Sequence, residues 1–202
     1  MAIDRRFNAE IPWIIAVGAS GCQGLRDLQE LLRALPLNLP AAILVVLHRP
    51  WSGPTYLQDV LAEACPLPIV VPTRGDRFEV GTVYIGEPAA HLTLAATRIA
   101  EIIDDPYRRY ANRTVDLLFK SVAAWTNKQK IGVVLSGELD DGSRGLAAIH
   151  TAGGMTMVLT PAQLPQRGMP ENAISYNGPI DLIGNPCQIA EGICAACLAQ
   201  KS

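Results

Sequence analysis

Apolar positions along the chain follow two alternating patterns, and this alternation predicts an α/β fold. Continuous apolar runs at 12–18, 41–47 and 131–135 are typical of strands buried on both faces of a parallel sheet. Between the first two runs, residues 25–35 place leucines at the spacing of one helix face. We therefore expect a three-layer fold, with helices on both faces of a mostly parallel, doubly wound sheet.

The same patterns predict the remaining elements. Helices are expected over 54–64, 114–125, 143–150 and 188–200, strands over 69–71 and 155–159, and a tight turn into a short helix over 168–174. The segment 74–103 differs, because turn signals separate short β-like runs at 83–85, 92–94 and 98–102. We interpret it as a strand followed by an inserted β-hairpin. Residues 1–11 are expected to form an N-terminal tail, and 12–202 one domain.

Composition narrows the class of protein. The chain has 202 residues, 49% of them hydrophobic and 18% charged, which supplies a sizeable core and argues against disorder. The net charge is −2 and no basic run is present, so nucleic acid and anionic membrane surfaces are not expected partners. No apolar run reaches the roughly 18 residues of a membrane-spanning helix, and the N-terminus resembles no secretory signal.

Five cysteines are present, which is an odd number, and reduced thiols in a cytoplasmic protein fit them best. Cys194 and Cys197 form a C-x-x-C pair within the predicted terminal helix. A redox pair or a metal site there is one interpretation, but a metal site would need two more ligands, and Cys187 alone is near. Packing of small apolar side chains is the favoured interpretation, and no metal or cofactor is expected.

The stretch from Ile14 to Gly24 is a strand, a small-residue turn and the start of a helix. Ser20 is expected at the carboxyl end of this strand, where open α/β sheets bind ligands and where a helix N-terminus favours negative charge. Taken alone, Ser20 is more simply explained as a helix N-cap.

Two other apolar strands end in polar residues, at His48 and at Asp141. Because parallel strands end at one edge of a sheet, Ser20, His48 and Asp141 are expected to converge as nucleophile, general base and orienting carboxylate. Each has a simpler explanation, since His48 fits a strand edge and Asp141 fits a cap for the helix near Ser143.

Further motifs make the chain resemble the catalytic domain of the bacterial chemotaxis protein-glutamate methylesterases. The resemblance runs from about residue 12 to about residue 185. It is carried by Val17-Gly18-Ala19-Ser20, Leu44 to His48, Gly81 to Ile85, His91-Leu92, Asn112-Arg113, Val115 to Phe119, Gly132 to Gly137, Asp141-Gly142 and Gly168-Met169-Pro170.

This resemblance implies hydrolysis of γ-glutamyl methyl esters, and deamidation of certain glutamines, on the cytoplasmic helices of chemoreceptors. It places the triad on Ser20, His48 and Asp141, and residues at the active-site mouth on Asn112 and Arg113. The family usually carries an N-terminal receiver domain in a phosphorelay. We expect that control to be absent here, or to come from a separate response-regulator or methyltransferase protein.

The sequence departs from the family at two places beside the triad. After the serine the family commonly has threonine or alanine and two glycines, whereas this chain has Gly21-Cys22-Gln23. Before Asp141, Glu138 and Leu139 replace a methionine or threonine and a glycine. The backbone N–H of Glu138 and the turn at Gly21 are expected to line the oxyanion site. Leu139 is expected to exclude the positive φ that glycine adopts cheaply.

These departures leave three hypotheses for function. The leading one is a serine methylesterase of the receptor type. The second is a regulatory or binding module that keeps the fold with weak or no turnover. The third is an esterase or amidase that acts on a partner outside chemotaxis. Cys22 as an alternative nucleophile is not favoured, because the family pattern aligns Ser20 with the serine.

Overall fold

A seven-stranded parallel sheet forms the centre of the computed structural model, with strand order β3-β4-β2-β1-β7-β8-β9. The structure describes residues 12–49, 56–88, 90–107, 109–110, 112–127, 129–162, 167–176 and 178–198. The predicted tail at 1–11 lies outside these ranges. The sheet strands are β1 (Trp13–Ser20), β2 (Ala41–His48), β3 (Ile69–Val70), β4 (Thr82–Ile85), β7 (Lys130–Val134), β8 (Met155–Leu159) and β9 (Leu182–Gly184).

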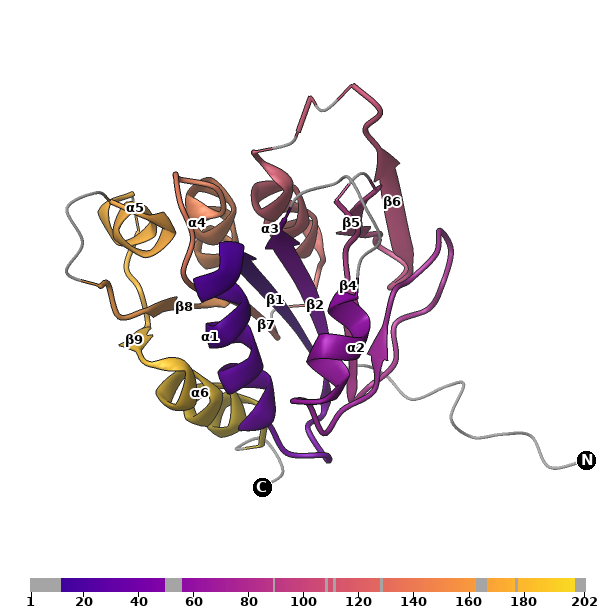
Figure 1. Cartoon of the computed structure of the whole chain (residues 1–202), viewed down its shortest axis with the longest axis horizontal. Helices are drawn as coiled ribbons and strands as arrows, with labels where there is room; N and C mark the ends of the chain where they lie inside the picture. Colours follow the sequence, from indigo (N-terminus) through magenta and orange to yellow (C-terminus); the bar gives the residue numbers. More distant parts are fainter. Residues whose placement is uncertain are drawn as a thin grey trace, which may run out of the picture.

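Helices cover both faces of this sheet, which confirms the predicted three-layer α/β fold (Figure 1). One face carries α1 (Gly21–Arg33), α2 (Leu57–Ala62) and α6 (Pro186–Leu198). The other carries α3 (Thr114–Ala124), α4 (Ser143–Thr151) and α5 (Met169–Ser175). None of the helices in the described ranges has the length and apolar character needed to cross a membrane.

The inserted hairpin is present as a separate two-stranded antiparallel sheet. It consists of β5 (Ala90–Leu94) and β6 (Ala100–Asp104), with Leu92 paired to Ile102. Leu92 is fully buried in the same core cluster as α3, and the preceding strand β4 belongs to the main sheet. The hairpin therefore extends the layer that contains α3.

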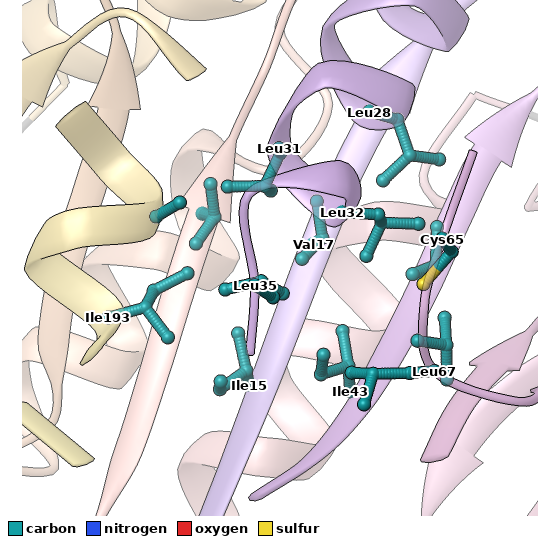
Figure 2. Close-up of a cluster of buried hydrophobic side chains, with 14 of the residues drawn as sticks. Ile15, Val17, Leu28, Leu31, Leu32, Leu35, Ile43, Cys65, Leu67 and Ile193 are labelled. Atoms are coloured by element: carbon teal, nitrogen blue, oxygen red, sulfur yellow. The ribbon is translucent and has the colours of Figure 1, made fainter. Parts of the chain in front are cut away.

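Alternation along β1 explains how one strand serves two cores. Ile15 and Val17 point to the layer of α1 and α6, whereas Ile14 and Ala16 point to the layer of α3, α4 and α5. Figure 2 shows leucines of α1, among them Leu31, packed over β1, with Ile193 of α6 beside them. Burial on both faces is the physical reason why these strands are continuously apolar.

Several predicted boundaries need correction. The first helix begins at Gly21 rather than at 25, because the chain turns directly from β1 into α1. The helix expected over 54–64 is α2, which the structure gives as Leu57–Ala62, and residues 54–55 lie outside the described ranges. The short strand β9 was not predicted, since three residues are too few to show a period.

The sheet has a topological switch point between β1 and β7. From β1 the chain adds β2, β3 and β4 on one side, with β3 at the edge, and then returns to add β7, β8 and β9 on the other. In open α/β sheets, ligands bind beyond the carboxyl ends of the strands at such a point. The fold therefore directs attention to the residues that follow β1, β2 and β7.

Candidate active site

A cleft of about 660 Å³ opens at the carboxyl ends of the central strands. Ser20 ends β1, His48 ends β2, and Ser136 and Asp141 follow β7. In the β1–β2 register, Ser20 lies directly beside His48. The cleft lining includes all three predicted triad residues, together with Gly21, Cys22, Gln23, Arg49, Asn112, Gly137, Glu138 and Leu139.

Ser20 occupies the N-cap position of α1, but its side chain makes no capping hydrogen bond. Its backbone is extended, with φ −146° and ψ 143°, and its N–H donates to the carbonyl of Ser136 at 2.8 Å. The simpler explanation of Ser20 as a side-chain cap is therefore wrong. Ser20 is half-buried and lines the cleft, and its hydroxyl is not used in a hydrogen bond to the helix.

His48 and Asp141 form the closest polar pair of the site. Nε2 of His48 lies 2.5 Å from Oδ2 of Asp141, and the two side chains are 20% and 4% exposed. The hydroxyl of Thr114 lies 3.3 Å from Nε2 and 3.5 Å from Nδ1 of the same ring. With Nε2 engaged by the carboxylate, Nδ1 is the nitrogen left to exchange a proton with a nucleophile.

The expected contact between Ser20 and His48 is open. Ser20 and His48 both lie in the described part of the chain, and there the serine hydroxyl makes no hydrogen bond to the imidazole. Catalytic hydrogen bonds of this kind are often long in ligand-free structures and tighten when substrate binds.

Asp141 caps a helix, but not the one expected. Helix α4 has Gly142 at its N-cap, with φ 93° and no side-chain capping bond. The Asp141 carboxylate instead accepts hydrogen bonds from the backbone N–H groups of Val115 and Asp116, each at 2.9 Å. It thus holds the N-terminus of α3, whose positive dipole end favours a carboxylate.

The loop after β7 forms the opposite wall of the cleft. Gly137 accepts the N–H of Met169 at 2.8 Å, and Glu138 forms a β-bridge with Gly168. A Cβ on Gly137 would meet Met169 Sδ at 2.2 Å and Ser20 Cβ at 2.7 Å. Only a glycine allows this loop to approach the serine so closely.

Leu139 corrects one expectation, because it adopts a φ of +68° despite its side chain. Its side chain is 59% exposed, and its carbonyl accepts the side-chain amide of Asn172 at 2.7 Å. The left-handed conformation costs a non-glycine residue about 1–2 kcal/mol. The loop thus keeps the backbone path that a glycine would give, and the Glu138 side chain is exposed.

The structure also locates the residues predicted at the mouth. Asn112 lines the cleft, whereas Arg113 is exposed and is absent from the cleft lining of the described residues. Arg49 lies next to His48, half-buried, and forms an ion pair with Glu87 at 3.3 Å. Burial lowers the pKa of Arg49, and the charge of Glu87 opposes this.

The other histidines and the C-x-x-C pair lie outside the cleft lining. The His91 side chain is buried, and its Nε2 lies 3.1 Å from Oδ2 of Asp105. His150 belongs to α4. Cys194 and Cys197 lie on α6 against the core, and burial raises the pKa of Cys197 to about 12. The described residues contain no group of three or more side chains arranged to hold a metal ion.

Sequence analysis missed the residues that support the triad from elsewhere in the chain. Thr114, the first residue of α3, lies against the His48 ring, and no side-chain capping bond is present at the start of that helix. Asn172 and Asp116 were assigned no role, although each contacts the loop or helix that follows β7. The sequence did carry a signal for one neighbouring residue: Glu171 stands three residues after Gly168, a spacing at which its carboxylate accepts the N-cap N–H, here at 2.9 Å.

Comparison with known proteins identifies the family and its fold. The family model described as CheB methylesterase matches residues 15–193. The protein-glutamate methylesterase/protein-glutamine glutaminase of Yersinia pestis bv. Antiqua (strain Antiqua) is 32% identical over 173 residues, covering 84% of this chain and 49% of that protein. Protein-glutamate methylesterase/protein-glutamine glutaminase 1 of Chromobacterium violaceum is 33% identical over 168 residues, covering 82% of this chain and 46% of that protein.

A solved structure extends the comparison to three dimensions. The catalytic domain of Thermotoga maritima CheB methylesterase superposes with a TM-score of 0.77 at 26% identity, covering 90% of this chain and 96% of that one. The chain spans about half the length of the curated relatives it matches. Its similarity to them therefore concerns a catalytic domain.

Fold and site together define a three-layer α/β protein with a serine, a histidine and an aspartate at the carboxyl edge of its sheet. The family-model match covers most of the chain and settles which group of such proteins this is. The chain belongs to the CheB methylesterase family.

Proposed function

We propose that this chain hydrolyses γ-glutamyl methyl esters on the cytoplasmic helices of chemoreceptors and releases methanol. The same site would deamidate glutamine side chains and release ammonia. The observation that carries the proposal is the His48–Asp141 pair at 2.5 Å, beside a serine that shares the strand register and the cleft. The names of the relatives include both activities.

In the proposed reaction, Oγ of Ser20 attacks the ester carbonyl carbon while Nδ1 of His48 accepts the hydroxyl proton. Asp141 stabilises the imidazolium that results. The tetrahedral oxyanion would accept hydrogen bonds from backbone N–H groups of the cleft, at Glu138 and Gly21. Removal of one such donor commonly costs roughly 3–4 kcal/mol of transition-state stabilisation.

The intermediate then breaks its bond to the methoxy oxygen, and His48 returns the proton so that methanol leaves. Water attacks the acyl-serine ester, again with His48 as the base, and the products are free Ser20 and a glutamic acid side chain, which releases its proton to solvent and becomes the carboxylate. No redox change occurs, and the proton removed from water restores the serine hydroxyl. Asn112 at the cleft and Arg113 outside its lining would contact the receptor helix that carries the ester.

A matched pair of variants tests the nucleophile. Ser20→Ala is expected to abolish methanol release from a methylated receptor cytoplasmic fragment, whereas Cys22→Ala is expected to retain it. Both residues line the cleft, so the pair separates chemistry from general damage to the site. Turnover that persists in folded Ser20→Ala would overturn the assignment, and loss in Cys22→Ala alone would transfer it to the thiol.

A second function, a binding module without turnover, is favoured by one observation. The Ser20 hydroxyl and the His48 ring, both described, are not hydrogen-bonded, and Gln23 and Glu138 add side chains to the same cleft. On this alternative the wild-type chain binds receptor helices and releases no methanol, and Glu138→Met with Leu139→Gly restores release. Wild-type turnover at an ordinary enzymatic rate would exclude it.

A further inference from the structure

Two buried carboxylates behind the histidine cap each other's helices. Asp141, which precedes α4, accepts the N–H groups of Val115 and Asp116 in the first turn of α3. Asp116, in α3, accepts the N–H of Gly145 in the first turn of α4 at 2.7 Å. In each helix, a backbone N–H of the first turn therefore donates to a carboxylate. For α3 this carboxylate comes from the loop that leads into α4, and for α4 it comes from α3.

The close approach of the two helices depends on Gly145. A Cβ at this position would meet Phe119 Cβ at 2.4 Å and Asp116 Cα at 3.2 Å. Ordinary side chains are excluded from such distances, so glycine at 145 is what lets α4, and the loop before it that carries Asp141, lie this close to α3.

Asp116 also places charge behind the triad. Its residue is 2% exposed, its Oδ2 has no hydrogen-bond partner among the described residues, and Nη1 of Arg144 lies 3.7 Å from that oxygen. The pKa of Asp116 lies above its ordinary value, mainly because the carboxyl group is buried. The hydrogen bond from the Gly145 N–H opposes this rise, and the neighbouring charge of Asp141 adds to it. Lys120 and Arg144 are the cations that act on it.

We propose that Asp116 is a positioning residue for the triad, which fixes the Asp141 carboxylate by reciprocal capping and adds negative charge that favours protonation of His48. This proposal deepens the function proposed above and rests on it for its catalytic meaning. The physical reason is that a general base works from a fixed place and with a tuned proton affinity. Asp116 supplies both through Asp141, without contact with the reacting atoms.

The test measures His48 directly, so that it does not depend on turnover. The imidazole Cε1–H signals of the chain's three histidines are followed by NMR against pH in a Ser20→Ala background, with His91→Gln and His150→Gln for assignment. Asp116→Asn is compared with Asp181→Asn. Asp181 also accepts a backbone N–H, from Thr156 at 2.7 Å, and lies outside the cleft lining.

Asp116→Asn is expected to move the titration of the His48 Cε1–H signal to lower pH, because a negative charge next to Asp141 has been removed. Asp181→Asn is expected to leave it unchanged. An unchanged His48 titration in folded Asp116→Asn would overturn the proposal. Failure of Asp116→Asn to fold would overturn it too, since the residue would then be a structural requirement.

With the Ser20 hydroxyl present, Asp116→Ala is expected to lower kcat about ten- to hundred-fold with little change in KM, through misplacement of the base. Asp116→Asn, which keeps an oxygen for the Gly145 N–H, is expected to recover most of that loss. An inactive wild type would contradict the proposed function and leave the His48 titration to decide the role of Asp116. Equal kcat in wild type and Asp116→Ala would overturn the positioning role.

Discussion

Asp141 holds His48 at 2.5 Å through the same carboxylate that accepts two backbone N–H groups at the start of α3. One side chain thus joins β7, β2 and α3, which are distant in sequence. The positive end of the α3 dipole attracts the carboxylate, and the carboxylate orients the imidazole. Structural stability and the proposed chemistry are therefore coupled at this residue.

Asp141→Asn is expected to reduce both the rate of methyl ester hydrolysis and the stability of the fold. The amide cannot stabilise an imidazolium, so methyl ester hydrolysis should fall roughly 10³–10⁴-fold. It also cannot accept from both backbone donors and His48, so the free energy of unfolding should fall by about 1–2 kcal/mol. Steady-state kinetics and urea unfolding measure the two effects on one preparation.

Asp140→Asn provides the matched control for that variant. Asp140 is next in sequence, its side chain is 57% exposed, and it forms an ion pair with Arg144 at 3.4 Å. An exposed pair of this kind contributes about 0.5 kcal/mol or less. Both activity and stability should stay close to wild type, and equal losses in the two variants would contradict the coupling described for Asp141.

Leu139→Gly is expected to stabilise the protein by up to about 1 kcal/mol. Relief of the left-handed strain outweighs the greater chain entropy of glycine in the unfolded state, and the exposed side chain contributes little burial. Urea unfolding measures the change. Leu37→Gly is the control, because Leu37 is 72% exposed without a positive φ and should lose stability instead.

Gly137→Ala is expected to damage the site and the fold together. The added methyl would overlap Met169 Sδ and Ser20 Cβ, and overpacking of this kind costs about 1–3 kcal/mol. Hydrolysis per folded molecule should also fall, because Ser20 is displaced. Gly153→Ala is the control, because a Cβ added there contacts no other atom and the positive φ of Gly153 is the only source of strain. Normal turnover in Gly137→Ala would show that the loop can move away.

Asp105 makes a predicted contribution to acid stability. Burial raises the pKa of its carboxyl, but the N–H of Tyr110, the His91 side chain and the N–H of Arg109 outweigh this and hold the pKa below its ordinary value. A lowered folded pKa contributes stability that is complete above the unfolded value of about 3.9 and is lost as the pH falls through the folded value.

The corresponding experiment is urea unfolding of Asp105→Asn and wild type from pH 6 down to pH 2.5. The two free energies of unfolding should differ by a constant amount above about pH 5 and converge in acid. Asp104→Asn serves as the control, since that carboxylate is exposed and pairs with Arg74 at 3.3 Å. A constant difference down to the lowest pH would contradict the assignment.

Much of the fold could be predicted from local pattern. Strands β1, β2 and β7 were predicted because burial on both faces leaves their central positions apolar, and α1 because leucines line one of its faces. The strand ends at Ser20 and His48 followed from the same patterns. The short β9 and the true start of α1 at Gly21 did not, because three residues or a single turn carry too little periodicity.

The support of the site could not be predicted in the same way. The contact of Thr114 with His48, and of Asn172 with Leu139, joins residues 66 and 33 positions apart. No local pattern encodes such distances. The positive φ of Leu139 was excluded by residue type, yet the loop around it imposes that φ through the Asn172 amide and the Gly168 bridge.

The sequence by itself determined which side chains stand at the ends of buried strands, because hydrophobic period and strand length are local properties. The tertiary structure decided what those side chains do. Ser20 and Asp141 are both preferred helix caps by residue type, but Ser20 makes no capping bond and Asp141 caps α3 rather than α4. The physical reason is that a capping donor can come from any helix whose N-terminus the fold brings within 3 Å, and the fold alone determines which helix that is.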